Sequence, residues 1–236
     1  MVLTDFNEKF LSCKELFLTF ALFLLPPVIA APRVVGTEYN RPDFLTLIIV
    51  MGLAETALVL YLVTHIGGRR LPDYNIMPFR PRCILFGILA GLLMFVLLIL
   101  AALPFIAFRA STGEMGWPTP RFRWSFTNYS LLPLMLIACL VTGYKEELYY
   151  RCYLPTEFFR HGMSAAHAVI LPVLFFGAGH FYQGGMGFAV ACLLGLYLTG
   201  VLRMAKNLHV PAVAHGLYNF CVLLLSGLDF ESYLGG

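Results

Sequence analysis

Charged residues are scarce in this sequence: Asp, Glu, Lys and Arg make up only 12% of its 236 residues. Soluble domains usually contain about a quarter. Together with a hydrophobic fraction of 59% and a mean hydropathy of +0.79, this shortage predicts a protein of the lipid bilayer. The formal net charge of +3 is too small to favour a nucleic-acid partner.

Several signatures of hydrolytic and metal chemistry are also missing. The six cysteines show no CxxC or other paired spacing, so neither a disulfide framework nor a cysteine zinc site is predicted. No GxSxG and no HExxH occurs, which argues against a serine hydrolase with a nucleophile elbow and against a zincin. The four aspartates, Asp5, Asp43, Asp73 and Asp229, lie in polar linkers or near the termini, so an intramembrane aspartyl dyad is not expected.

Long apolar runs dominate the rest of the chain. Several approach the length of about 20 residues that a helix needs to cross a bilayer. Seven such stretches lie near 16–31, 44–66, 83–108, 128–143, 163–180, 186–202 and 210–228. The sequence therefore predicts an all-α, polytopic transmembrane helical bundle of about seven to eight spans, with residues 1–236 in a single membrane-embedded domain.

The first and third stretches have features of their own. The first ends in small residues, as a cleaved signal peptide does, but Asp5 and Glu15 stand among the lysines at its start. That pattern differs from a basic n-region, so a retained helix is favoured. Pro104 predicts a kinked or tilted third helix. Trp117 and Trp124, in the linker that follows, are expected to anchor at the membrane interface.

Lysine and arginine are distributed unevenly between the two sides of these spans. With the N-terminus inside, eleven lie on the inner side and five on the outer side. The inner set is Lys9, Lys14, Arg69, Arg70, Arg80, Arg82, Lys145, Arg151, Arg160, Arg203 and Lys206, and the outer set is Arg33, Arg41, Arg109, Arg121 and Arg123. Because cytoplasmic loops carry the excess of positive charge, a cytoplasmic N-terminus is predicted. The compact chain favours the inner membrane of a prokaryotic cell.

A few ionisable residues interrupt the apolar stretches. They are Glu55, a cluster at 145–151, His167, His180 and His215. A charge inside a bilayer costs about 2.5–3.5 kcal/mol on insertion scales, so such residues are functional candidates. Glu55 stands alone in mid-span and must find a partner or be protonated. We expect it to form a structural pair rather than to take part in catalysis.

The cluster lies in the segment YKEELYYR, residues 144–151. Glu147 and Arg151 are four residues apart, so on a helix they share a face and can pair. Glu146 points about 100° away from that face, which leaves its carboxylate free. The alternative is a solvated loop between two spans, but the aromatic residues around the charges make the segment too apolar for one.

Two further pairs have the same helical spacing. Phe176 and His180 in FGAGH, and His215 and Asn219 in HGLYN, each lie four residues apart and so share a helix face. The alternatives are a helix-end histidine satisfied by a backbone carbonyl, and polar residues that join neighbouring membrane helices. Each pair alone is a weak signal, but the three patterns together favour a site.

Helix rise gives an estimate of whether these residues meet. If a turn lies near Gly162, Glu146 and His180 differ in depth by about 3 Å in an antiparallel hairpin. Pro155 should bend the first arm. His215 is expected about 10 Å from that level, unless tilt or a break at Gly184–Gly185 closes the gap.

In this order the three patterns resemble the CAAX-protease and bacteriocin-processing family (CPBP, or Abi) of intramembrane glutamic endopeptidases. The family's EExxxR, FxxxH and HxxxN stand here at 146–151, 176–180 and 215–219, and the resemblance covers about 128–228. It implies a catalytic half at 128–228, a helical bundle with a water-containing cavity, and peptide hydrolysis without a covalent intermediate. Cys152 departs from the glycine often found after the arginine, and it could alter substrate choice.

The resemblance also implies a role for each motif residue. Glu146 is expected to be the general base, with His180 orienting the attacking water and helping to deprotonate it. His215 and Asn219 are expected to stabilise the oxyanion. In supporting positions, Glu147 and Arg151 would hold the site or meet the substrate, and Phe176 completes the second motif. No cofactor is expected, and the partner would be a membrane-associated protein or peptide, cleaved near its C-terminus in some members.

Two alternative functional interpretations of the same residues are consistent with the sequence. Glu146, Glu147, His180 and His215 could bind a catalytic Zn²⁺, since three nitrogen or oxygen ligands and a water suffice. Alternatively, buried carboxylates and histidines could serve proton transfer in a transporter, or a non-enzymatic partner-binding protein. Prenylated CAAX proteins, bacteriocins and C-terminal sorting tags are all possible substrates of an endopeptidase of this kind.

Overall fold

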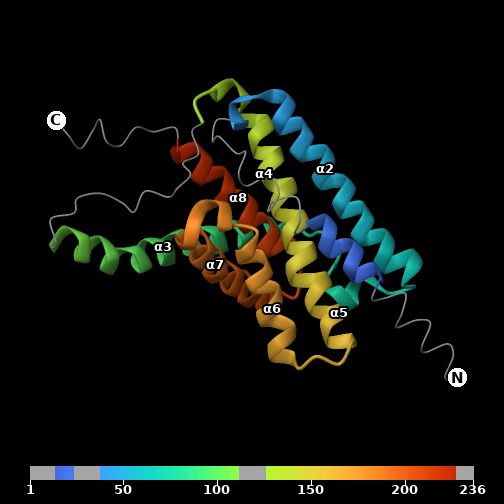
Figure 1. Ribbon diagram of the computed structural model, residues 1–236. Helices are drawn as coiled ribbons and strands as arrows, with labels where there is room; N and C mark the ends of the chain where they lie inside the picture. Colours follow the sequence, from blue (N-terminus) through green and yellow to red (C-terminus); the bar gives the residue numbers. More distant parts are fainter. Residues whose placement is uncertain (1–13, 24–37, 112–125, 227–236) are drawn as a thin grey trace, which may run out of the picture.

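The computed structural model describes residues 14–23, 38–111 and 126–226, and α-helices, supplemented by short 3₁₀ and π turns, are the regular elements found there. Figure 1 shows these helices gathered into one bundle, in which α8 crosses α4 near the centre and α2 follows α4 on the outside. The predicted all-α membrane bundle is confirmed for these residues.

The described residues form seven principal helices after a helix at residues 14–23. These are α2 (Pro42–Tyr61), α3 (Arg82–Ser111), α4 (Leu132–Glu147), α5 (Leu154–Arg160), α6 (Ala165–Ala178), α7 (Gly184–Ala205) and α8 (His209–Ser226). Two π-helical turns, η3 (Leu62–Ile66) and η6 (Leu148–Tyr153), follow α2 and α4. Short 3₁₀ turns lie at η2 (Glu38–Asn40), η4 (Leu71–Tyr74), η5 (Tyr129–Leu131) and η7 (Phe181–Gln183).

Helices fill most of each predicted apolar stretch wherever the structure describes it. Among the described residues, four segments are long and apolar enough to cross a membrane: Pro42–Ile66, Arg82–Ala101, Phe181–Ala205 and His209–Ser226. The apolar helix Ala165–Ala178 is shorter. The helix α3 continues through Pro104. Residues 24–31, Cys13 and both tryptophans lie outside the described residues, and the five described cysteines are free thiols.

The charged segment is part of one continuous helical rod made of α4, η6 and α5. Pro155 near the start of α5 has no N–H to donate, and the π turn η6 precedes it directly, with the N–H of Leu154 bonded to the carbonyl of Tyr149. A π turn, which is itself a common cause of helix bends, thus lies next to the position where a bend is predicted. The rod ends at a turn where Gly162 has a φ of +87°, which glycine adopts without strain. The segment is therefore helical and buried, not a solvated loop.

Two glycines allow α4 and α8 to approach each other at backbone distance. A Cβ added to Gly143 would lie 2.7 Å from the carbonyl oxygen of Ala212 and 2.7 Å from the nitrogen of Gly216. A Cβ added to Gly216 would lie 2.8 Å from the Cα of Leu140. Small residues are the usual means of such close packing in membranes. The crossing brings the end of α4, with its two glutamates, directly against His215.

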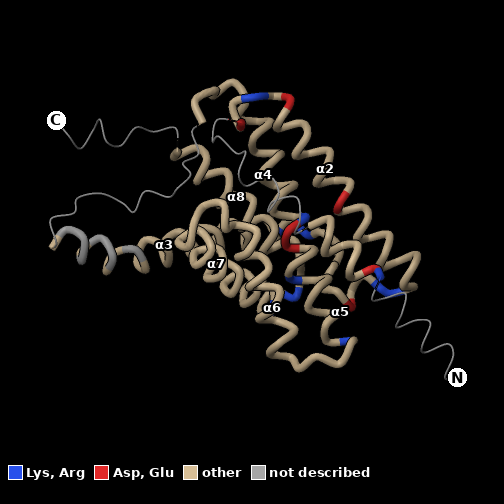
Figure 2. The backbone as a smooth tube through the Cα atoms, in the orientation of Figure 1, with Lys and Arg blue, Asp and Glu red and all other residues tan. Residues whose placement is uncertain are grey.

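The loops sort into two ends of the bundle. At one end, the N–H of Leu208 bonds to the carbonyl of Asn75 (2.9 Å), and His209 Nε2 lies 3.0 Å from the carbonyl oxygen of Met77. At the other end, Asn40 Oδ1 accepts from the N–H of Thr127 (2.7 Å). Figure 2 shows that charged residues gather at helix ends and in a cluster inside the bundle, while the outer helical surfaces carry few.

A buried polar network fixes the first of these ends. Arg69 Nη1 donates to Glu157 Oε1 over 2.8 Å, and the Tyr74 hydroxyl donates to the same carboxylate oxygen. Burial, together with this carboxylate, raises the pKa of the Tyr74 phenol far above its ordinary value, so the hydroxyl stays protonated and keeps donating. The network fastens the loop after α2 to the end of the α4–α5 rod.

Candidate functional site

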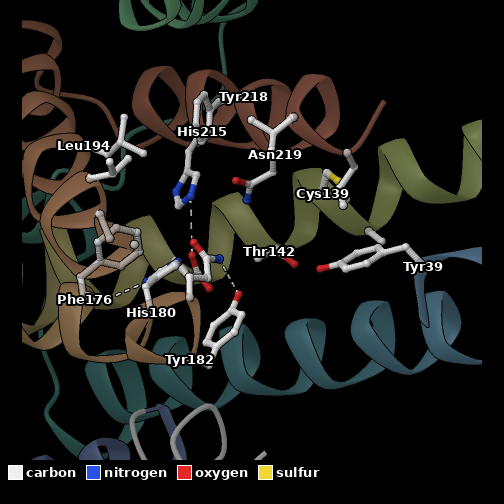
Figure 3. A pocket seen from close by; sticks show the side chains of 18 residues that line it. Tyr39, Cys139, Thr142, Phe176, His180, Tyr182, Leu194, His215, Tyr218 and Asn219 are labelled. Carbon is white, nitrogen blue, oxygen red and sulfur yellow. Dashed lines mark hydrogen bonds and ion pairs between the residues drawn. The ribbon is translucent and has the colours of Figure 1, made fainter. Parts of the chain in front are cut away.

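A cavity of about 210 Å³ lies where α4, the end of α6 and α8 meet. Figure 3 shows its lining side chains, with His215 and Asn219 of α8 directed toward the side chains from α4 and from the end of α6. The motif residues that line it are Glu146, Phe176, His180, His215 and Asn219. The structure thus gathers residues of all three motifs around one space, although these motifs are spread over positions 146 to 219 of the sequence.

His215 lies between the two glutamates of α4. Its Nδ1 is 2.8 Å from Glu147 Oε1, and its Nε2 is 3.6 Å from Glu146 Oε2. Because a carboxylate can only accept a hydrogen bond, Nδ1 of His215 is the donor to Glu147. The ring is therefore fixed with Nε2 toward Glu146. This arrangement parallels the use of a buried carboxylate to orient a catalytic histidine.

The contacts of His215 remove the expected 10 Å offset in depth. The Phe176 ring centroid lies 4.7 Å from that of His180 and 5.7 Å from that of His215, so one aromatic ring touches both imidazoles. The sequence indicates a break at Gly184–Gly185 as one way to close this gap. A break is present there, because the 3₁₀ turn η7 and Gly184, with a φ of +84°, separate α6 from α7, and α8 packs mainly on α3 and α4.

His180 ends α6 with one ring nitrogen already satisfied. Its Nδ1 lies 2.8 Å from the backbone carbonyl oxygen of Phe176, which can only accept, so Nδ1 donates. This is the bond expected for a purely structural histidine. The ring nevertheless lines the cavity, and a neutral imidazole that donates through Nδ1 has an acceptor lone pair on Nε2. The structural bond thus sets the tautomer that a water-orienting role needs.

Glu147 and Arg151 are not in the cavity lining but behind it. Arg151 Nε lies 3.3 Å from Glu147 Oε2, so the predicted pair one helical turn apart is present. The guanidinium carbon of Arg151 also stacks 4.0 Å from the centroid of the Phe176 ring. Glu147 thus holds His215 with one oxygen and Arg151 with the other. Cys152 is fully buried and is not part of the cavity lining, so any influence on substrate choice would be indirect.

Several residues that line the cavity were not predicted. They are chiefly Tyr39, Cys139, Thr142, Tyr182 and Tyr218. Helical spacing could have indicated Thr142, four residues before Glu146, and Tyr218, three residues after His215. No local signal points to Tyr39, which precedes α2. His167, by contrast, lies exposed in the first turn of α6, where Ser164 Oγ is 2.7 Å from its Nδ1.

A second hollow, of about 340 Å³, adjoins this cavity and shares Glu146 and His180 with it. Its outer wall is apolar and includes Leu47 and Met51 of α2, each at least half exposed. Lys145 Nζ and Glu55 Oε2 form an ion pair in its lining, 2.8 Å apart. Glu55 therefore has the structural partner that its mid-span position required.

Breaking this pair should loosen α2 from α4. Lys145→Met leaves Glu55 without its partner, and we expect a lower midpoint of thermal unfolding in detergent. The charge-reversed pair Glu55→Lys with Lys145→Glu should recover part of the loss, because both charges are again compensated. A double-mutant cycle of Glu55→Lys and Lys145→Glu should give a coupling free energy of about 0.5–3 kcal/mol. If the effects of these two single substitutions on the free energy of unfolding simply add, the ion pair contributes nothing.

Among the described residues, no group of three or more His, Cys, Asp or Glu side chains is arranged to hold a metal ion. Within the cavity, Glu146 Oε2 and His215 Nε2 lie 3.6 Å apart. Because Nδ1 of His215 donates to Glu147, this histidine could offer a metal only its Nε2. The donor set in this conformation does not fit a catalytic zinc with three protein ligands.

Comparison with protein families gave one match in the part of the chain that forms the cavity. The model described as type II CAAX prenyl endopeptidase Rce1-like matches residues 128–221. The matched region contains all three motifs and the helices α4 to α7, together with α8 as far as residue 221. Searches of the curated proteins and of the solved structures found no match.

Proposed function

Given that residues 128–221 form a domain of the Rce1-like family of membrane endopeptidases, we propose that Glu146 activates a water molecule for attack on a peptide bond. One observation carries the proposal: Glu146, His180, His215 and Asn219, from three separate helical segments, line one cavity. Glu146 keeps an acceptor oxygen toward this space, because Glu147 rather than Glu146 binds Nδ1 of His215. A carboxylate in such a site can serve as a general base.

His180 would share the water with Glu146. Its Nδ1 donates to the Phe176 carbonyl, so its Nε2 can accept a hydrogen bond from the water and set the direction of attack. The water oxygen adds to the carbonyl carbon, and Glu146 takes the proton. Glu146 then delivers this proton to the leaving amine as the carbon–nitrogen bond breaks, which returns the carboxylate without a covalent intermediate.

His215 and Asn219 would stabilise the oxyanion that forms at the carbonyl oxygen. The Asn219 amide can donate directly. His215 already donates through Nδ1 to Glu147, so it must be protonated on both nitrogens to donate through Nε2 as well. Fixed donors in a water-poor cavity contribute about 3–4 kcal/mol each to transition-state stabilisation in comparable sites.

The second hollow supports a substrate that comes from the membrane. Its apolar wall on α2 leads to Glu146 and His180, so an extended segment attached to a lipid or to a membrane helix could reach the catalytic carboxylate from the bilayer. We propose a membrane-associated protein or peptide that is cleaved near its C-terminus. The excess of positive charge at one end of the spans supports a cytoplasmic N-terminus.

The test compares peptide termini in cell membranes that contain either the wild-type chain or Glu146→Gln at equal abundance. Mass spectrometry should find new C-terminal or N-terminal peptides in the wild-type sample that are missing from the Glu146→Gln sample. Asp73→Asn, which alters an exposed carboxylate outside the cavity lining, is the matched control and should keep the wild-type pattern. Identical patterns in all three samples would defeat the peptidase function and leave a transporter or partner-binding protein.

Metal removal separates the proposed mechanism from the zinc alternative. We expect cleavage by the purified protein to be unchanged after exhaustive chelation, because Glu146 acts on the water without a Lewis acid. Loss of cleavage on chelation, followed by its return on addition of Zn²⁺ alone, would overturn the role of Glu146 as the base that acts without metal.

A further inference from the structure

A separate cavity, of about 410 Å³, lies at the end of the bundle where three helices meet the loops. The membrane-spanning segment of α3 begins at Arg82, that of α7 ends at Ala205, and that of α8 begins at His209. The cavity is lined by residues next to all three of these ends. It therefore lies at the level where a bilayer has its phospholipid headgroups, and none of its lining residues belongs to the catalytic cavity.

The charges around this cavity have one sign. Arg80, Arg82 and Lys206 line it, and its lining contains no acidic residue. None of the three cations forms an ion pair with a described residue of the chain, whereas Arg69 and Arg70, at the same end, each pair with a carboxylate. Three uncompensated cations around one hollow repel one another, and an anion among them would relieve that repulsion.

On the side toward the membrane spans, the cavity is lined by apolar side chains that are exposed at the protein surface. Phe86 lies one helical turn into the span of α3, and Met204 lies near the end of α7. Their exposed fractions are 52% and 81%. Asn207, which is buried, also lines the cavity, and its side-chain nitrogen donates to Cys83 Sγ over 3.5 Å. Cations at the headgroup level with exposed apolar side chains just below them match the two parts of a phospholipid.

We propose that this cavity binds the phosphate headgroup of an anionic phospholipid through Arg80, Arg82 and Lys206, with an acyl chain lying over Phe86 and Met204. Basic pockets between membrane helices are suited to such headgroups, since each lysine or arginine near an anionic lipid surface contributes about fivefold in affinity. The shared chemistry is that of a phosphate ester, so a soluble phosphate is the alternative ligand that the test must separate.

A general excess of positive charge at this end of the bundle would attract anionic lipid without favouring the residues that line the cavity. Arg70, Arg160 and Arg203 are also exposed cations at this end of the bundle, with Arg70 paired to Asp73, and they do not line the cavity. Substitution of these three arginines removes the same number of positive charges and therefore serves as the control. If anionic lipid were attracted only by net charge, the two sets of substitutions would act alike.

The test is native mass spectrometry of the purified full chain in detergent, titrated with phosphatidylglycerol or with phosphatidylcholine. We expect a tight one-to-one complex with phosphatidylglycerol and weak binding of phosphatidylcholine. The variant R80Q/R82Q/K206Q should bind phosphatidylglycerol on the order of 100-fold more weakly. The control R70Q/R160Q/R203Q should bind as the wild type does. Equal losses in both variants, or equal binding of both lipids, would overturn the proposal.

Two further measurements cover a triple variant that does not fold and a site that binds free phosphate. If the triple variant does not fold, R80Q and K206Q are measured singly, and each should weaken binding about fivefold. Inorganic phosphate and glycerol 3-phosphate are added as competitors at millimolar concentration. Displacement of phosphatidylglycerol by either competitor would show that the site recognises free phosphate rather than a lipid. Because these readouts do not involve cleavage, they stand apart from the proposed peptidase function.

Discussion

Glu146→Gln should lower the rate of peptide cleavage by about 10²–10⁴-fold while leaving the protein folded, because the amide cannot take a proton from water. The side chain keeps its size and lies in the cavity lining with partial exposure, so packing should change little. The measurement is the single-turnover rate on a synthetic peptide that spans a cleavage site identified in membranes. A rate within tenfold of the wild type would rule out Glu146 as the base.

Glu147→Gln provides the contrast, because its side chain lies behind the cavity. Glu147 is completely buried, accepts from His215 and pairs with Arg151. Its neutralisation should reduce the cleavage rate through misplacement of His215, and it should also lower the thermal midpoint by leaving Arg151 uncompensated. Thermal stability therefore distinguishes the two variants, because only Glu147→Gln should lower the thermal midpoint markedly.

Gly143→Ala should cause the second-largest loss of cleavage rate, although glycine has no side chain that could take part in the reaction. The new Cβ would lie 2.7 Å from two backbone atoms of α8, so α4 and α8 must move apart. A shift of about 1 Å between reacting groups can cost about 10²-fold in rate. We expect a loss of that size, together with a destabilisation of about 1–3 kcal/mol from overpacking.

Gly200→Ala is the matched control for this substitution. Gly200 lies in α7, and a Cβ placed there meets no atom within 4 Å. Cleavage should remain at the wild-type rate, and the helix should be slightly stabilised, because alanine has the higher helix propensity. Normal cleavage by Gly143→Ala would show that the close crossing of α4 and α8 is not needed to bring Glu146 and His215 together.

The sequence was sufficient to predict the helices and the grouping of residues within each motif. Low charge and long apolar runs indicate membrane helices, and the four-residue spacing places Glu147 with Arg151 and His215 with Asn219 on shared faces. These predictions depend on local geometry alone. The same local rule could have added Thr142 and Tyr218 to the lining residues.

Contacts between helices could not be obtained in this way. The bond from His215 to Glu147 joins positions 68 residues apart and depends on the backbone contact of Gly143 with Gly216, which leaves no periodic trace in the sequence. Helix rise alone left a depth gap of about 10 Å at His215, and the sequence could not decide whether the break at Gly184–Gly185 that closes it would form. Tyr39 reaches the cavity from the segment before α2, where no motif marks it.

A double-mutant cycle of Glu146→Gln and His180→Gln tests most directly whether these two side chains act on one water. The cleavage rates of the wild type, both single variants and the double variant are measured on the same peptide under single-turnover conditions. Groups that work as a unit are strongly non-additive, so the double variant should be no more than about threefold slower than the slower single variant. Multiplication of the two individual losses would contradict a shared water in the cavity.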